Sequence, residues 1–88
     1  MTKAMTEEEF NRLLLLVDKL CGENSDYAIG YKRTLRRRYH RLFYGTDLEQ
    51  AQELIMTNRS AEMGRGHRDG LAGREPIPND AHLDDSPK

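Results

Sequence analysis

Residues 26–44 read DYAIGYKRTLRRRYHRLFY and predict a helix with one apolar side and one basic side. Ser25 is one of three consecutive residues that commonly cap helix N-termini, and Gly45 is a natural stop. Gly30 weakens the first turns, so a later start also fits the sequence. Apolar residues recur every three or four positions, as they do on a helix face that packs against a core. They are Ala28, Tyr31, Leu35, Tyr39 and Leu42.

The other side of this helix is strongly cationic. Residues 27–46 hold six Lys or Arg residues and no acidic one, although the whole chain has a formal net charge of −1. At about 100° per residue, the basic side chains cover a broad arc that barely overlaps the apolar face. Like charges three and four residues apart repel each other, so acidic neighbours or an anionic partner must offset that cost. The candidate partner-binding residues are Lys32, Arg33, Arg36, Arg37, Arg38, His40 and Arg41.

Three uses of this basic face are open. The arginines can bind nucleic-acid phosphates, and aromatic residues of the same segment can stack on bases if they are exposed. The planar fork of arginine also suits carboxylates, so an acidic protein surface is an alternative partner. The third reading is a solvated face, partly paired with the acidic start of the first helix or with Asp47, Glu49 and Glu53. The aromatic residues that could stack on bases in the nucleic-acid reading are Tyr27, Tyr31, Tyr39, Phe43 and Tyr44.

A first helix is predicted over Glu7–Cys21. Thr6 and Glu9 have the spacing of a capping box, and Gly22 follows as a stop. Six apolar residues share one face of this helix. They are Phe10, Leu13, Leu14, Val17, Leu20 and Cys21. Leu15 points away from that face and Leu16 lies at its edge, which suggests a second contact surface such as a homodimer interface.

A third helix is predicted over about Asp47–Thr57. Thr46 and Glu49 have capping-box spacing. The face expected to be buried holds Leu48, Ala51, Gln52 and Ile55, with Leu54 and Met56 beside it.

Residues 59–73 contain four glycines and leave two readings open. One is a short helix capped by Ser60, in which Gly66 and Gly70 permit close approach of another helix. The other is a flexible loop, because each glycine in a helix costs about 1 kcal/mol. From Arg74 onward, three prolines and little apolar content predict a tail.

The predicted fold is all-α: a small three-helix bundle or an open helical assembly, allowing a short fourth helix and a flexible C-terminal tail. The expected organisation is a helical domain over 1–58, a glycine-rich segment over 59–73 and a disordered tail over 74–88. The longest apolar run, Leu13–Val17, is far shorter than the roughly 20 residues of a membrane span. The acidic start does not resemble a signal peptide, and a single cysteine suits a reducing compartment. A cytoplasmic location without membrane contact is expected.

No pattern in the sequence indicates catalysis, so we expect the protein not to be an enzyme. His40, His67 and His82 are far apart and are expected on the surface, and Cys21 has no second cysteine. No metal-ligand spacing is present, so neither a metal nor another cofactor is expected. The glycines of residues 64–73 do not have the spacing of a phosphate-binding loop.

Residues 64–73, GRGHRDGLAG, resemble a Gly-x-x-Asp-Gly-x-x-Gly pattern that occurs in many short, uncharacterised bacteriophage and prophage proteins. The resemblance implies an origin in a mobile element and a protein that acts by binding, often as a regulator or inhibitor of host machinery. Together with the basic helix, it leads to an expected function: a small helical protein that contacts nucleic acid. The alternative is a phage-type inhibitor or adaptor that binds an acidic surface of a host protein, for example a defence or transcription component.

Overall fold

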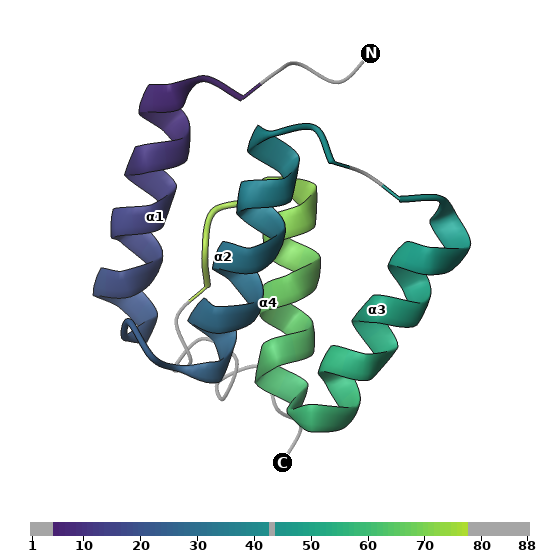
Figure 1. The fold of residues 1–88 in the computed structure, drawn as a ribbon. Coiled ribbons are helices and arrows are strands. Elements are labelled where there is room, and N and C mark those ends of the chain that lie inside the picture. Colours follow the sequence, from purple (N-terminus) through teal and green to yellow (C-terminus); the bar gives the residue numbers. More distant parts are fainter. Residues whose placement is uncertain (1–4, 43, 78–88) are drawn as a thin grey trace.

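The computed structural model describes residues 5–42 and 44–77, and these residues form four α-helices. They are α1 (Glu7–Cys21), α2 (Asp26–Tyr39), α3 (Thr46–Arg59) and α4 (Ala61–Ala72). In Figure 1, α2 lies in front of α4, with α1 on one side and α3 on the other. The predicted all-α helical bundle is therefore confirmed, and the optional fourth helix is present. None of these helices has the length and apolarity needed to cross a membrane.

α1 has the predicted bounds. The amide nitrogen of Glu9 donates to the side-chain oxygen of Thr6 at 3.1 Å, and Gly22 ends the helix with a φ of 89°. Leu13 and Val17 are buried, and Leu16 packs against the same core from a partly buried position. Leu15 is 73% exposed. The second contact surface suggested by the sequence is thus reduced to one leucine.

α2 ends at Tyr39, so the prediction that it continues to Tyr44 was wrong. The chain turns because Arg41 adopts a left-handed conformation with a φ of 58°. The amide of Leu42 then donates to the carbonyl of Arg37 at 2.8 Å, and the amide of Arg41 donates to the carbonyl of Arg38 at 3.1 Å. This pair of bonds closes a Schellman-type helix end. Leu42, expected on the apolar stripe, is 56% exposed as a result.

The glycine-rich segment is a helix, and it packs along α2. The side chain of Ser60 caps α4 by accepting from the amide of Met63 at 3.5 Å. A Cβ on Gly66 would overlap the carbonyl oxygen of Tyr27, and one on Gly70 would overlap that of Tyr31. These two glycines therefore permit the close helix approach that the sequence predicted. The sequence analysis separated residues 59–73 from the helical domain of residues 1–58. In the structure α4 packs on α2 and belongs to the same folded unit.

The core lies mainly between α1 and α2, with α4 closing the far side of α2. Its buried apolar members are Leu13, Val17, Tyr27, Ala28, Tyr31 and Leu35. At one end of α1, the ring of Phe10 stacks on that of Tyr39, with ring centroids 4.3 Å apart. α2 is consequently buried along one full side, and this burial orients the basic residues on its other side.

α3 differs most from expectation. Its N-cap is Gly45, which makes no side-chain capping bond, so Thr46 does not begin a capping box. Met56 is buried, whereas Leu48 is 59% and Ile55 is 52% exposed. The side of α3 that faces the bundle carries the carboxylates of Glu49 and Glu53, which bind arginines of α2 and α4. The apolar face predicted for the core therefore points away from it.

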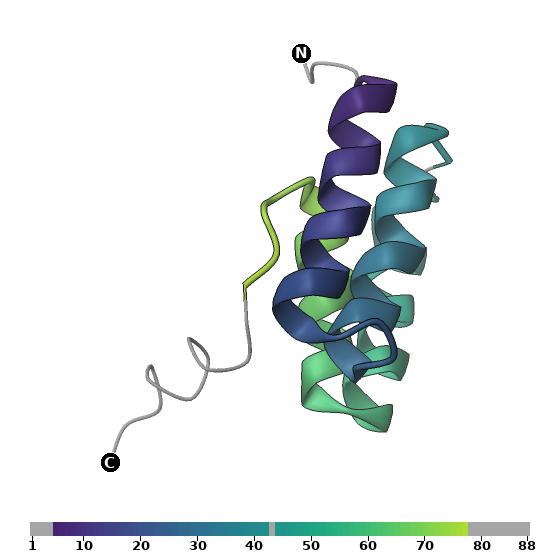
Figure 2. The ribbon, with the colours of Figure 1, turned by 90° about the vertical axis from the view of Figure 1, so that its left-hand side faces the viewer.

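The first four residues of the predicted tail are held against the bundle. The hydroxyl of Tyr31 donates to the carbonyl of Arg74 at 2.5 Å, and the amide of Ile77 donates to the hydroxyl of Tyr27 at 3.1 Å. The thiol of Cys21 on α1 also contacts the carbonyl oxygen of Ile77, at 3.5 Å. Figure 2 shows this segment on one side of the molecule, opposite α2. Residues 78–88 of the predicted tail lie outside the described residues.

Candidate partner-binding surface

The basic residues of α2 point in three directions because the helix is flanked by α1 and α3. Lys32 points towards α1, where its Nζ is 2.7 Å from Oδ1 of Asp18 and 3.1 Å from the carbonyl oxygen of Glu23. Arg38 points towards the end of α4 and donates to the carbonyl oxygen of Leu71 at 3.0 Å. Both residues therefore stabilise the fold, although the sequence suggested a role in partner binding.

Arg37 is the most deeply engaged of the predicted binding residues. Its Nη2 lies 2.5 Å from Oε2 of Glu49 on α3, and the two side chains are only 12% and 13% exposed. Its guanidinium carbon also lies 4.4 Å from the ring centroid of Tyr44. Burial opposes ionisation of Glu49, but hydrogen bonds from Arg37 and the Tyr44 amide outweigh it, so the pKa of Glu49 is lowered. Arg37 is thus the ionic link between α2 and α3.

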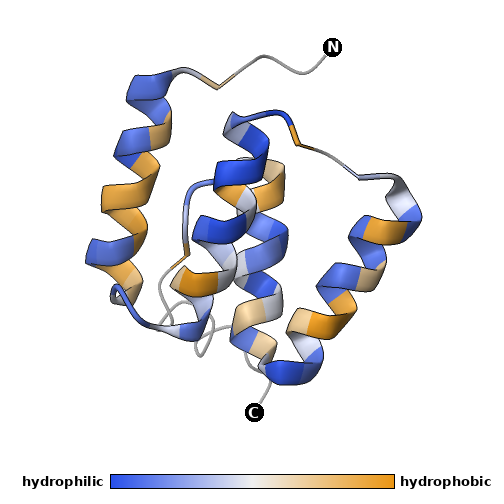
Figure 3. Ribbon diagram, in the orientation of Figure 1, coloured by the Kyte–Doolittle hydropathy of each residue, from blue (hydrophilic) through white to orange (hydrophobic). Residues whose placement is uncertain are grey.

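Four basic residues remain exposed, and we call them the basic stripe. They are Arg33, Arg36, His40 and Arg41. The first three lie on one outward side of α2 at helical spacing, and none of the four forms an ion pair among the described residues. Ile29, one turn before Arg33, is 45% exposed on the same side. In Figure 3 the front of α2 is mostly hydrophilic, whereas α3 carries several hydrophobic segments.

The sequence had suggested that tyrosines of this region could stack on bases if they were exposed. In the structure they are buried or already in contact with another side chain. Tyr27 and Tyr31 are fully buried, and Tyr39 stacks on Phe10. Tyr44 is 49% exposed, but Arg37 lies over its ring. Phe43 lies outside the described residues.

A groove runs between α2 and α3. Its volume is about 220 Å³, and its lining residues are Arg33, Gln52, Ile55, Met56 and Arg59. We call it the α2–α3 groove. Met56 forms a buried part of the lining, and Ile55 is half exposed. Each helix contributes one arginine that forms no ion pair among the described residues. The sequence interpretation missed Arg59 because α3 was predicted to end at Thr57. It also placed Ile55 in the core.

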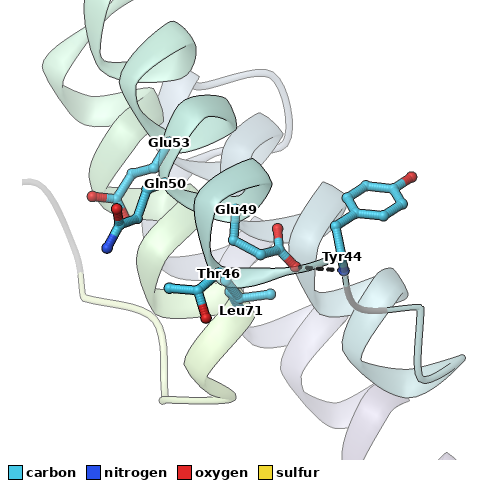
Figure 4. A pocket seen from close by; sticks show the side chains of 6 residues that line it. All are labelled: Tyr44, Thr46, Glu49, Gln50, Glu53 and Leu71. Carbon is cyan, nitrogen blue, oxygen red and sulfur yellow. Dashed lines mark hydrogen bonds between the residues drawn. The ribbon is translucent and has the colours of Figure 1, made fainter.

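A second hollow lies on the other side of α3 and is shown in Figure 4. Its volume is about 260 Å³, and six residues line it: Tyr44, Thr46, Glu49, Gln50, Glu53 and Leu71. Both of its carboxylates already have cationic partners. Glu49 binds Arg37, and Glu53 accepts from Nη2 of Arg68 at 2.8 Å. This hollow therefore offers less unbalanced charge than the α2–α3 groove.

The motif that resembles phage proteins has a structural role in this chain. Gly66 and Gly70 contact the α2 backbone, and Oδ2 of Asp69 accepts from the buried hydroxyl of Tyr27 at 2.5 Å. Burial and this contact with Asp69 raise the pKa of Tyr27. Gly73 follows α4 in a left-handed conformation, with a φ of 70°.

His67 lies inside the same motif and is fully buried, so its expected surface position was wrong. The reason is that it lies on the side of α4 enclosed by α2 and α3. Neither ring nitrogen has a hydrogen-bond partner among the described residues. Burial is the main cause of the lowered pKa of His67, partly opposed by Glu53. His40 is exposed as expected, and His82 lies outside the described residues.

Within residues 5–42 and 44–77, no group of three or more His, Cys, Asp or Glu side chains could hold a metal ion. The same residues include guanidiniums that form no ion pair among them and that lie next to exposed apolar side chains. No family model, no curated protein and no solved structure matches the chain. A functional assignment therefore has to rest on the geometry of the basic stripe and the α2–α3 groove.

Proposed function

We propose that the protein is a non-enzymatic, cytoplasmic binding protein whose basic stripe and α2–α3 groove hold an acidic surface of another protein. In this proposal it acts as a phage-type inhibitor or adaptor, and the partner belongs to host machinery. The observation that carries the proposal is the mixture of charge and apolarity on one face. Arg33 and Arg36 adjoin Ile29 on α2, and Arg33 and Arg59 flank Ile55.

Protein interfaces are built in this way. Their centres are enriched in arginine, aromatic and apolar side chains and depleted in lysine and carboxylates. The outward side of α2 has arginines at positions 33 and 36, and its one lysine is turned towards Asp18. The exposed Leu48, Leu54 and Ile55 of α3 would remain in water if the partner offered only phosphates.

The arginines of this face are also electrostatically unsatisfied. Arg33 and Arg36 lie three residues apart on α2, so their guanidinium groups repel each other by a few tenths of a kcal/mol. Glu49 and Glu53, two of the acidic residues that could have offset this repulsion, are bound to Arg37 and Arg68, and Asp18 binds Lys32. A partner rich in carboxylates supplies the missing compensation.

Nucleic acid is the second candidate partner, and the arrangement of the basic stripe favours it. Arg33 and Arg36 lie along α2, which is at the edge of the molecule in Figure 2, and Arg41 follows just beyond its end. None of the three forms an ion pair among the described residues. Three phosphate contacts would make log K fall with log salt at a slope of about −2.7 on duplex DNA. Binding to an acidic peptide would show a weaker dependence.

The test is a fluorescence anisotropy titration with two labelled probes, a glutamate-rich peptide and a short duplex DNA, over about 50–200 mM salt. The test variant is Arg33→Glu with Arg36→Glu. The control variant, Arg12→Glu with Lys19→Glu, makes the same charge change on α1. We expect the peptide to bind wild type and the control, but not the test variant. Tight DNA binding at the steep slope, without peptide binding, would replace this proposal by the second candidate. Binding of neither probe would refute both.

A simpler measurement separates the candidates during purification. The chain has no tryptophan and four tyrosines, so its absorbance at 280 nm is weak. A small amount of bound nucleic acid would therefore raise the ratio of absorbance at 260 and 280 nm. We expect a ratio typical of protein alone, and the same ratio for the Arg33→Glu, Arg36→Glu variant.

A further inference from the structure

We infer that the α2–α3 groove receives one amphipathic helix of the partner, which places carboxylates on Arg33 and Arg59 and an apolar side chain between Ile55 and Met56. This inference rests on the proposed function and specifies the partner's chemistry and its place on the surface. Four features of the groove support it: its size, its charge, its apolar lining and its continuity with the outer side of α3.

The size of the groove fits a side chain better than a free small molecule. Pockets for drug-sized ligands usually measure about 300–1,000 Å³ and enclose most of the ligand. The α2–α3 groove measures about 220 Å³ and lies between two exposed arginines. It therefore suits one anchoring side chain that projects from a larger surface.

The charge of the groove calls for an anionic occupant. Arg33 comes from α2 and Arg59 from α3, so the two walls each contribute one guanidinium. Neither guanidinium forms an ion pair among the described residues, and the remaining polar lining residue, Gln52, is neutral. Carboxylates of a partner would bind both walls at once, and arginine forks favour carboxylate geometry.

The apolar part of the site extends beyond the groove along α3. Leu48, Ala51 and Ile55 lie at i, i+3 and i+7, which places them on one side of the helix. All three are exposed, and they span about 10 Å at 1.5 Å per residue. A partner helix presents apolar side chains with the same i, i+3 or i+4, i+7 spacing when it lies along such a surface. An extended or compact anion would leave this stripe uncovered.

The ion pairs of α3 keep the groove in place. Arg37 binds Glu49 on one side of α3, and Arg68 binds Glu53 further along the helix. Met56 is anchored in the interior at 5% exposure. α3, one wall of the groove, is thus tied to α2 and to α4. The groove therefore needs less ordering when a partner binds.

The test uses a synthetic peptide of about 15 residues, in which leucines are spaced i, i+3, i+4 and i+7 and most other positions are glutamate or alanine. One control peptide has lysine at every glutamate position. A second has the same composition in an order that breaks the amphipathic pattern. Binding is followed by anisotropy, and the contact surface is mapped from amide chemical shifts in ¹⁵N-labelled protein. A short duplex DNA is titrated in parallel.

The test variants are Arg59→Glu and Ile55→Asp, and the matched control is Lys19→Glu, which reverses a charge on α1 outside both the groove and the basic stripe. Arg36→Glu is measured as well, because it lies in the basic stripe but outside the groove. All four positions are exposed, so thermal unfolding should change little. We expect the amphipathic glutamate peptide to lose at least about tenfold in affinity with either test variant and less than about threefold with Lys19→Glu. Arg36→Glu should weaken binding less than either test variant does. The shift changes should centre on residues 33, 52, 55, 56 and 59. Both control peptides should bind at least about tenfold more weakly than the amphipathic one.

Other outcomes would overturn the inference in distinguishable ways. Peptide binding that depends on Arg36 but not on Arg59 would move the acidic partner to the basic stripe, which leaves the proposed function in place. Equal binding of the scrambled peptide would exclude a helix-specific groove. DNA binding without peptide binding would overturn the proposed function as well. Concentration-dependent self-association that Ile55→Asp abolishes, without peptide binding, would make a second copy of this chain the occupant.

Discussion

Replacing Gly66 by alanine should destabilise the protein, although the same change stabilises most helices. Alanine is favoured over glycine inside a helix by about 1 kcal/mol. At Gly66, however, the new Cβ would overlap the carbonyl oxygen of Tyr27 and lie 2.9 Å from the amide nitrogen of Tyr31. Both are backbone atoms of α2, so no side chain can rotate away, and α2 and α4 must move apart.

The expected size of the effect follows from these two opposing contributions. Overpacking that forces a backbone shift costs about 1–3 kcal/mol, occasionally more. The upper end applies because fully buried residues from both helices, Tyr27 and His67 among them, would lose contacts when the helices separate. After subtracting the gain in helix propensity, Gly66→Ala should lower the free energy of unfolding by about 2 kcal/mol. For a domain of this length, that corresponds to a fall in Tm of roughly 8–16 °C.

The assay is thermal and urea unfolding followed by circular dichroism, with Gly45→Ala as the control. A Cβ on Gly45 meets nothing within 4 Å, so this change should cost less than about 1 kcal/mol through the weaker N-cap alone. An increase in Tm for Gly66→Ala would show that α2 and α4 are not in backbone contact at this point. It would also remove the structural explanation given for the glycine motif.

Three further predictions concern the ends and the interior of the same helices. Arg41→Gly should raise the free energy of unfolding by about 0.5–1 kcal/mol in urea titrations. A left-handed residue other than glycine costs about 1–2 kcal/mol, and glycine removes this cost. Glycine also makes the unfolded chain more flexible, which reduces the gain in stability. Arg37→Ala should lower it by about 2–4 kcal/mol by leaving Glu49 buried without its partner, whereas Arg36→Ala should stay within about 0.5 kcal/mol. The pKa of His67 in the folded state is below its ordinary value of 6.5. As pH drops, the unfolded chain therefore takes up the proton first. The free energy of unfolding should fall as pH drops from neutrality through 6.5. His67→Leu should flatten the pH dependence of the urea midpoint between about pH 7.5 and 5.5. This range lies above the ordinary pKa of glutamate, so carboxylates contribute little to the slope. An unchanged slope would contradict a buried, neutral imidazole at position 67.

The helix ends that sequence predicted correctly are those with local chemical signals. The side chain of Thr6 caps α1 by accepting from the Glu9 amide, Gly22 ends that helix, and Ser60 caps α4. Each signal acts within a few residues, so it can be read without knowing the fold. The end of α2 was missed because its left-handed residue is Arg41 rather than a glycine. Gly45, six positions beyond Tyr39, is the more familiar stop signal.

The exposed face of α3 was missed for a different reason. The sequence rule assigns apolar residues at helical spacing to the core, and it assigned Leu48 and Ile55 there. The packed side of α3 instead uses Glu49 and Glu53, whose partners Arg37 and Arg68 come from other helices. No local pattern in α3 reveals that its carboxylates will be neutralised at long range.

The candidate site was predicted in part. The sequence identified every exposed cation of α2, but it could not separate them from those engaged inside the fold, because the acceptors lie far away in the chain. Asp18 is 14 residues from Lys32, and the carbonyl of Leu71 is 33 residues from Arg38. The expectation that Glu49 pairs with the basic face was correct, whereas Arg59 entered the site only through the longer α3. Charge reversal at Arg37, which a sequence-based test would include, would unfold the α2–α3 contact and mimic a loss of binding.

The left-handed conformation of Arg41 costs stability, and Arg41→Gly tests whether that cost serves the proposed binding. A domain of 88 residues typically has about 4–13 kcal/mol of stability, so a left-handed arginine and a row of repelling cations are appreciable costs. Arg33 and Arg36 lie on the outward side of α2 and Arg41 lies just beyond its end, while the inward side of α2 is packed closely against α4. If Arg41→Gly stabilises the fold and also weakens binding of an acidic probe, the strained conformation serves to present the guanidinium. If it stabilises the fold and leaves binding intact, Arg41 lies outside the contact surface, and the site is confined to Arg33, Arg36 and the α2–α3 groove.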